Sequence, residues 1–152
     1  MRSSKETTRL GDDAADELTN VRTVRQLFAC FGQGDIAGAV SLLTVDVEWL
    51  VAGRPEIVPW AGIRRGREQV ALFFTILAET VELQQLRPLE LMTDGDIVVV
   101  FGHEQSRVKT TDRVCASDWV MAFTLRDGQI ARFREYLDTA AWAAAYGAPP
   151  GA

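Results

Sequence analysis

The chain has 152 residues, 47% of them hydrophobic and 24% charged, which is typical of one soluble globular domain. Its formal net charge of −5 at pH 7 argues against nucleic acid or an anionic membrane surface as a partner. The sequence contains no apolar run that could cross a bilayer and no signal-peptide segment, so we expect a cytoplasmic protein.

The first half of the chain is predicted to form three helices, with one strand between the second and the third. Residues 1–12 are polar and are predicted to form a flexible tail. Apolar residues at helical spacing predict a helix over about 14–31, and Asp35 is placed to cap a second helix. Strand-forming residues follow over 45–51, and then two prolines and two glycines predict a loop before a third helix over 66–80.

The second half of the chain is predicted to form an antiparallel meander. Two Asp-Gly pairs lie between β-rich runs, a pattern that favours tight hairpins. The predicted strands span residues 81–92, 97–108, 114–125 and 129–137. A short helix then runs to Gly147, and residues 148–152 form a tail, which leaves 13–147 as a single domain. Helices segregated from an antiparallel sheet predict an α+β fold in which the sheet curls around the three N-terminal helices.

Three segments of the chain resemble the SnoaL-like branch of the nuclear transport factor 2-like superfamily. They are GQGDIAGAVSLLTVDVEW, VPWAGIRRGREQVALFF, and DGDIVVVFG with WVMAFTLRDGQIARFREYLDTAA. The resemblance covers roughly residues 20–146 and implies a cone-shaped α+β barrel around an apolar pocket, often dimerised through the outer sheet face. Relatives include ketosteroid isomerase, polyketide cyclases, scytalone dehydratase, limonene-epoxide hydrolase and proteins without enzymatic activity, so fold alone does not define a function.

Strand alternation predicts which side chains face this pocket. It places His103, Tyr136 and Asp138 there as catalytic candidates, because each can move or hold a proton. Glu104 is expected on the opposite face, and Glu135 falls on the row opposite Tyr136. The predicted substrate contacts are Trp49, Trp60, Phe74, Gln105, Arg107, Trp119 and Met121. Large aromatic residues on strands are also common core residues, so packing is the alternative for Trp49 and Trp119.

Asp138 has two interpretations. The run Asp-Thr-Ala-Ala-Trp is a good helix start, with Asp138 as the cap. The resemblance places a catalytic aspartate of limonene-epoxide hydrolase at this position, while that enzyme's other two catalytic positions fall on Gln105 and Arg107. The catalytic positions of ketosteroid isomerase fall on apolar residues, namely Leu27, near Val51, and Trp119 or Met121.

Two functions follow as hypotheses. The first is a cofactor-free acid–base enzyme of cyclase, isomerase, dehydratase or epoxide hydrolase type, acting on a polyketide-, terpenoid- or steroid-like substrate. The alternative is a non-catalytic protein that binds a small apolar molecule. With one histidine and no Cys/His cluster we expect no metal site, and the resemblance implies a homodimer.

Overall fold

The computed structural model of the protein describes residues 4–151, with side chains from residue 13 onward. Three helices lie in the first 80 residues: α1 (Ser4–Gln33), α2 (Ile36–Ser41) and α3 (Arg67–Thr80), the last of them after the first two strands of the sheet. The predicted helices are confirmed, although α1 starts at Ser4 and so includes most of the segment predicted as a tail. Residues 1–3 and 152 lie outside the described residues, and the flexibility of both ends stays a prediction.

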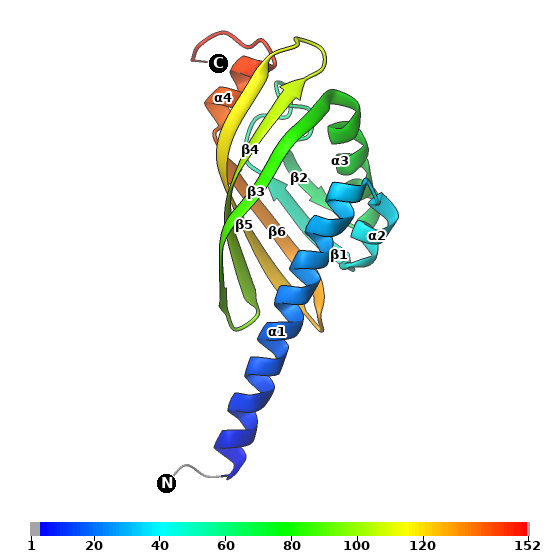
Figure 1. Ribbon diagram of the computed structural model, residues 1–152. Coiled ribbons are helices and arrows are strands. Elements are labelled where there is room, and N and C mark those ends of the chain that lie inside the picture. Colours follow the sequence, from blue (N-terminus) through cyan, green and yellow to red (C-terminus); the bar gives the residue numbers. More distant parts are fainter. Residues whose placement is uncertain (1–3, 152) are drawn as a thin grey trace.

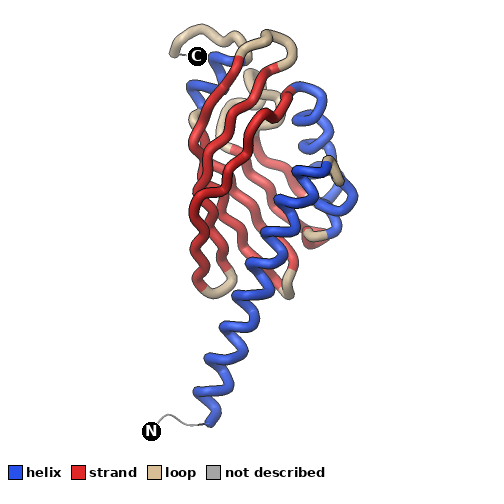
Figure 2. Tube along the Cα trace, in the orientation of Figure 1, coloured by secondary structure: helices blue, strands red, loops and turns tan. Residues whose placement is uncertain are grey.

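Six strands form one curved sheet that wraps around the helices (Figures 1 and 2). The strands are β1 (Leu43–Val51), β2 (Gly62–Arg65), β3 (Val81–Asp94), β4 (Ile97–Val108), β5 (Val114–Arg126) and β6 (Gln129–Leu137). Their order is β2-β1-β6-β5-β4-β3, and every pair is antiparallel except β1 with β6. The predicted α+β cone, with the N-terminal helices on the concave side of the sheet, is confirmed.

Short-range signals explain most of the element ends. Gly95 and Gly128 occupy the two hairpin turns with φ of 60° and 75°, the left-handed region that glycine adopts without steric cost. Asp35 caps α2 by accepting a hydrogen bond from the Gly38 amide at 2.8 Å. Strand β2 was not predicted, because its four residues follow a loop rich in glycine and proline, and pairing with β1 brings them into the sheet.

A close contact between β4 and β5 shapes the core. The Trp119 ring of β5 lies directly over Gly102 of β4, where a Cβ atom would overlap the ring. Helix α1 also packs against this tryptophan, because its Phe28 stacks on the Trp119 ring with ring centroids 5.9 Å apart. A side chain at position 102 is therefore excluded by the helix–sheet packing itself.

The outer face of the sheet carries both polar and apolar side chains. Phe101 of β4 and Tyr136 of β6 are 37% and 48% exposed. The homodimer expected over this face stays a prediction. Within residues 4–151, none of the helices is both long and apolar enough to cross a membrane.

Candidate functional site

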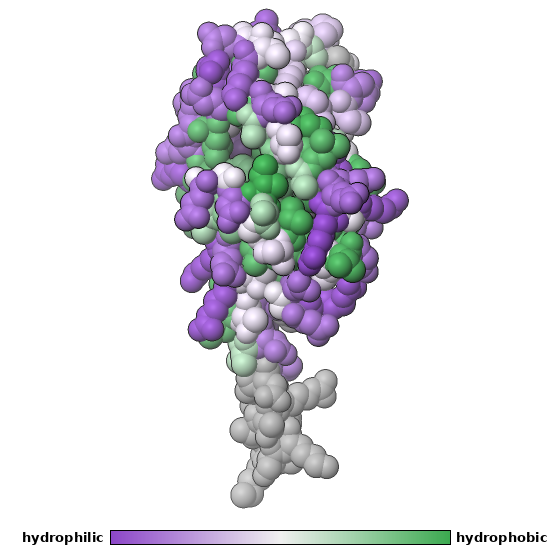
Figure 3. Space-filling model, turned by 90° about the vertical axis from the view of Figure 1, so that its right-hand side faces the viewer, coloured by the Kyte–Doolittle hydropathy of each residue, from purple (hydrophilic) through white to green (hydrophobic). Residues whose placement is uncertain are grey.

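A cavity of about 250 Å³ lies between the helices and the concave face of the sheet. Its wall draws on α1, α2, α3, five of the strands and the C-terminal helix α4 (Thr139–Ala145). Leu83 of β3 lines the cavity and is 37% exposed, so the cavity reaches the surface beside this strand. Figure 3 views the side of the molecule that carries the helices, and apolar side chains gather at its centre between polar ones. A second hollow, of about 230 Å³, lies between α1 and strands β3 and β4.

Two glutamates project into the first, apolar cavity. Glu104 of β4 and Glu135 of β6 both line it and are only 8% and 6% exposed. Their orientation follows from strand pairing, because residues directly opposite each other share a face of the sheet. Glu104 lies opposite the buried Ser117, and Glu135 lies opposite Met121, which also lines the cavity.

The apolar surroundings change the proton affinity of both carboxyl groups. Burial raises the pKa of Glu104 to about 7, although the Trp142 Nε1–H, which donates to Glu104 Oε1 at 3.2 Å, and the charge of His103 act in the opposite direction. Burial, and then the negative charge on Glu104, hold the pKa of Glu135 well above its ordinary value of 4.5. Both carboxyl groups therefore hold their protons more tightly than an ordinary glutamate, and Glu104 exchanges its proton near pH 7.

Further polar atoms of the cavity wall have no partner among the described residues. The Ser106 Oγ and the Trp49 Nε1 are both buried without a hydrogen bond. No hydrogen bond from a described side chain contributes to the pKa of Glu135 either. Unpartnered polar groups are costly in a folded core, so their presence marks a site where a ligand can supply the missing contacts.

The C-terminal helix closes one end of the cavity. Trp142 of this helix packs edge-to-face against Trp60, with ring centroids 4.8 Å apart. At its end the Tyr146 hydroxyl accepts from Trp60 Nε1 at 2.8 Å and donates to Thr80 Oγ1 at 3.0 Å. These bonds tie α4 to the loop before β2 and to α3, so the indole that contacts Glu104 is firmly positioned.

Comparison with known proteins identifies the family. A family model described as the SnoaL-like domain matches residues 24–133, which is most of the chain. The chain belongs to the SnoaL-like domain family. No curated protein matches it.

Solved structures agree with this SnoaL-like assignment. An NTF2-like protein from Burkholderia xenovorans LB400 is 36% identical, with a TM-score of 0.79 and coverage of 86% of this chain and 98% of that one. TerC, co-crystallised with polyporic acid, is 26% identical, with a TM-score of 0.76 and coverage of 84% and 98%. An NTF2-like protein of unknown function from Burkholderia pseudomallei K96243 is 24% identical, with a TM-score of 0.76 and coverage of 86% and 98%, and shows the shared fold alone.

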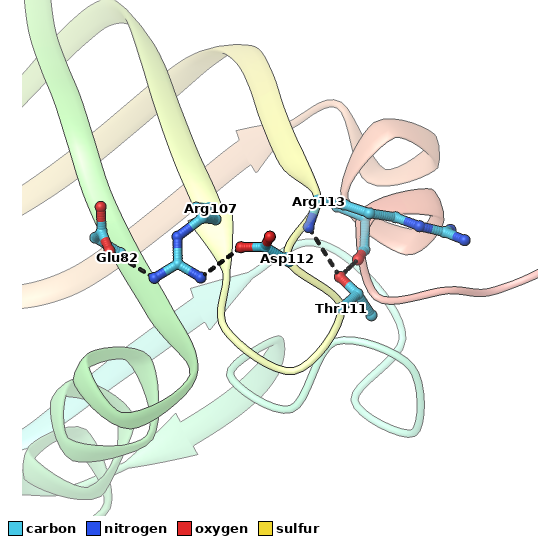
Figure 4. A network of polar contacts seen from close by, with 6 residues as sticks. Glu82, Arg107, Thr111, Asp112 and Arg113 are labelled. Carbon is cyan, nitrogen blue, oxygen red and sulfur yellow. Dashed lines mark hydrogen bonds and ion pairs between the residues drawn. The ribbon is translucent and has the colours of Figure 1, made fainter.

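The predicted phase of β4 in this SnoaL-like domain is wrong. His103, Gln105 and Arg107 lie on the outer face, and none of them lines the cavity. His103 Nδ1 lies 2.7 Å from Asp118 Oδ1 on the same outer face. Arg107 bonds to Glu82 at 2.6 Å and Asp112 at 2.9 Å, beside the loop that contacts α4 (Figure 4). The strand begins with Ile97, Val98, Val99 and Val100, which are β-branched and apolar on both faces, so alternation alone could not show which face points inward.

The predicted phase of β6 is wrong as well. Tyr136 is on the outer face, and Asp138 is exposed at the start of α4 rather than at the cavity. Asp138 Oδ1 accepts from the Ala141 amide at 3.0 Å, which confirms its interpretation as the helix cap. The inward row is Phe133, Glu135 and Leu137. A register shift beside Thr124 and Leu125 changes the alternation, so that both Ile130 and Phe133, three residues apart, point inward.

The predicted substrate contacts divide into three groups, one of which is Gln105 and Arg107 on the outer face. Trp49, Trp60, Phe74 and Met121 line the cavity, and their binding role stays a prediction. Trp119 is part of the core instead, packed against Gly102 and Phe28. The two cavity glutamates were missed because each was placed on the opposite face. The available signal was cross-strand pairing with the β5 row that carries Trp119 and Met121, whose inward direction was predicted correctly.

Substitution of Asp138 tests its role as a cap. We expect Asp138→Ala to cost about 1 kcal/mol of unfolding free energy, whereas Asp138→Asn changes it by only a few tenths, because asparagine caps nearly as well. Urea denaturation of the three proteins measures both values. A loss as large for asparagine as for alanine would show that the negative charge, not the capping bond, is what matters.

Proposed function

We propose that this protein is a cofactor-free acid–base enzyme that acts on a small, mainly apolar molecule. The observation that supports it is a pair of buried glutamates in an otherwise apolar cavity, with their pKa values displaced upward. Groups with displaced pKa values in a cavity are common at catalytic sites. TerC, which was co-crystallised with polyporic acid, is consistent with a small-molecule site in this fold.

The two carboxyl groups suit complementary roles. Glu104, with a pKa of about 7, can remove a proton from the substrate at neutral pH. Glu135, whose pKa burial raises well above 4.5, can in its protonated form donate a proton to a second substrate atom, which neutralises negative charge that develops there. One proton enters the pair and one leaves it, and transfer of a proton from Glu104 back to Glu135 restores the starting state. Isomerisation, dehydration, cyclisation and epoxide opening of a polyketide-, terpenoid- or steroid-like substrate all require such paired transfers.

The alternative function is binding without catalysis. It is favoured by the position of Asp138, Gln105 and Arg107, which the resemblance aligns with the limonene-epoxide hydrolase positions and which lie away from the cavity. The two functions differ in one property: only the enzyme needs a reactive base inside the cavity.

A generic proton-abstraction probe tests for that base without knowledge of the natural substrate. The probe is 5-nitrobenzisoxazole, an apolar molecule whose ring opens to a coloured cyanophenolate when a base removes its carbon-bound proton. We expect the protein to accelerate this reaction, with a rate that rises with pH through about 7, and Glu104→Gln to reduce the rate by at least about tenfold.

The matched control is Glu79→Gln, which removes an exposed carboxylate of α3 outside the cavity lining and is expected to leave the rate unchanged. A rate that is equal in the wild-type protein and the Glu104→Gln variant would reject Glu104 as a base. It would favour the binding alternative.

A further inference from the structure

Among the described residues, the cavity lining carries acidic side chains but no basic ones. The lining contains three carboxyl groups, those of Asp35, Glu104 and Glu135, and contains no lysine, arginine or histidine among the described residues. The two basic side chains of β4 are bound elsewhere: Arg107 by Glu82 and Asp112, and His103 by Asp118, all on the outer face. Nothing in the wall therefore neutralises an ionised Glu104 or Glu135.

The rest of the lining is aromatic. Trp49, Trp60 and Trp142 surround the cavity, together with phenylalanines such as Phe74 and Phe133. Aromatic ring faces carry negative electrostatic potential and attract cations, most strongly when the cation is weakly hydrated. Carboxylates and ring faces together favour positive charge, whereas an anion would meet carboxyl groups and no basic side chain.

Two polar side chains of the cavity wall, Glu135 and Ser106, have no hydrogen-bond partner among the described side chains. Glu135 is 6% exposed and receives no hydrogen bond that lowers its pKa, in contrast to Glu104, which Trp142 contacts. Ser106 Oγ, 1% exposed, is likewise without a partner among the described residues. A buried carboxylate is stable only when a counter-charge or hydrogen bonds compensate it, so the missing partner has to come from the ligand or from a proton.

We propose that the cavity selects apolar organic cations, such as tertiary or quaternary ammonium compounds, over neutral and anionic molecules of the same shape. The proposal rests on the proposed function in that both place the ligand beside Glu104 and Glu135. It goes further by assigning the ligand's charge.

Three compounds of matched shape test the charge preference: phenyltrimethylammonium, tert-butylbenzene and benzenesulfonate. Each is a benzene ring with one compact tetrahedral group, and their charges are positive, neutral and negative. Calorimetric titration near pH 8 is expected to show that the cation binds at least about tenfold more tightly than the hydrocarbon, and that the sulfonate binds least.

The double variant Glu104→Gln/Glu135→Gln identifies the cause. It is expected to lower the affinity for the cation to that of the hydrocarbon, while the affinity for the hydrocarbon stays within about twofold. The variant Glu79→Gln should bind all three compounds as the wild-type protein does. Thermal unfolding of each variant checks that it is folded.

Each contrary result has a distinct meaning. A hydrocarbon that binds as tightly as the cation, or a cation affinity that survives the double substitution, overturns the charge preference and leaves the acid–base function standing. Failure of all three compounds to bind overturns the inference together with the assignment of this cavity as the ligand site. Loss of proton abstraction with retained cation preference rejects only the catalytic proposal.

Discussion

The double variant Glu104→Gln/Glu135→Gln is expected to be more stable than the wild-type protein at about pH 8 and equally stable at about pH 4. Both carboxyl groups have a higher pKa in the folded state than the ordinary value of 4.5. Between those values the folded protein holds protons that the unfolded chain has released, so stability falls as pH rises. The neutral amides remove this penalty.

Glu104 alone sets a lower limit for the gain in unfolding free energy at about pH 8. A tenfold change in an ionisation equilibrium corresponds to about 1.4 kcal/mol, so a pKa raised from 4.5 to about 7 corresponds to about 3 kcal/mol lost between these pH values. Glu135 adds a loss in the same direction, because its pKa is also raised. Glutamine at position 104 keeps an acceptor for Trp142 Nε1, so the hydrogen bond of 3.2 Å is not sacrificed.

Thermal unfolding from about pH 4 to about pH 8 measures the difference between the two proteins. Asp46 and Glu82 act with the opposite sign, because hydrogen bonds from Arg126 and Arg107 lower the pKa of each, but they are present in both proteins and cancel in the comparison. The variant Glu79→Gln should follow the wild-type curve. A double variant that gains nothing at high pH would show that the two carboxyl groups are not held in an apolar environment.

A second large effect is expected at the contact between β4 and β5. We expect Gly102→Ala to cost about 3 kcal/mol, which lowers the melting temperature by about 10 °C, because the new methyl group overlaps the buried Trp119 ring. The ring cannot move away freely, since Phe28 of α1 stacks on it. The strain would therefore pass to α1 and to the cavity wall, of which Phe28 is a part.

A double-mutant cycle isolates this contact. The cost of Gly102→Ala should fall by more than half in a Trp119→Leu background, because the smaller side chain leaves room for the methyl group. Gly32→Ala in α1 provides the control: no atom lies within 4 Å of its added Cβ, and helix propensity favours alanine by up to about 1 kcal/mol. Equal costs of Gly102→Ala in both backgrounds would place the strain in the backbone rather than against Trp119.

The two cavity glutamates, Glu104 and Glu135, illustrate a conflict between stability and function. Two buried carboxyl groups with no basic partner in the cavity lining destabilise the fold at neutral pH. This loss of stability is explained if a ligand or a reacting substrate interacts with the two carboxyl groups. Their burial without a basic partner in the lining accounts for the expected stability gain, the rate profile with the proton-abstraction probe and the affinity for cations.

Local sequence signals determined the elements and the family. The helical spacing of Val21, Val24 and Leu27, the glycines of the hairpin turns and the capping positions of Asp35 and Asp138 depend on neighbours a few residues away. Such signals act in the chain itself, so they could be interpreted correctly before any tertiary contact was known. The inward direction of Trp119 and Met121 was clear for the same reason, because β5 alternates with large apolar residues.

Only the tertiary structure decided which acids meet in the cavity. The apolar run before Glu104 offers no contrast between its two faces, and the register shift near Leu125 alters the alternation that leads to Glu135. A slip of one residue reverses every side chain of a strand, so the choice depended on pairing with β5 across the sheet. Gly102 had to lie beneath the Trp119 ring, and this contact between distant segments turned Glu104 inward and His103 outward.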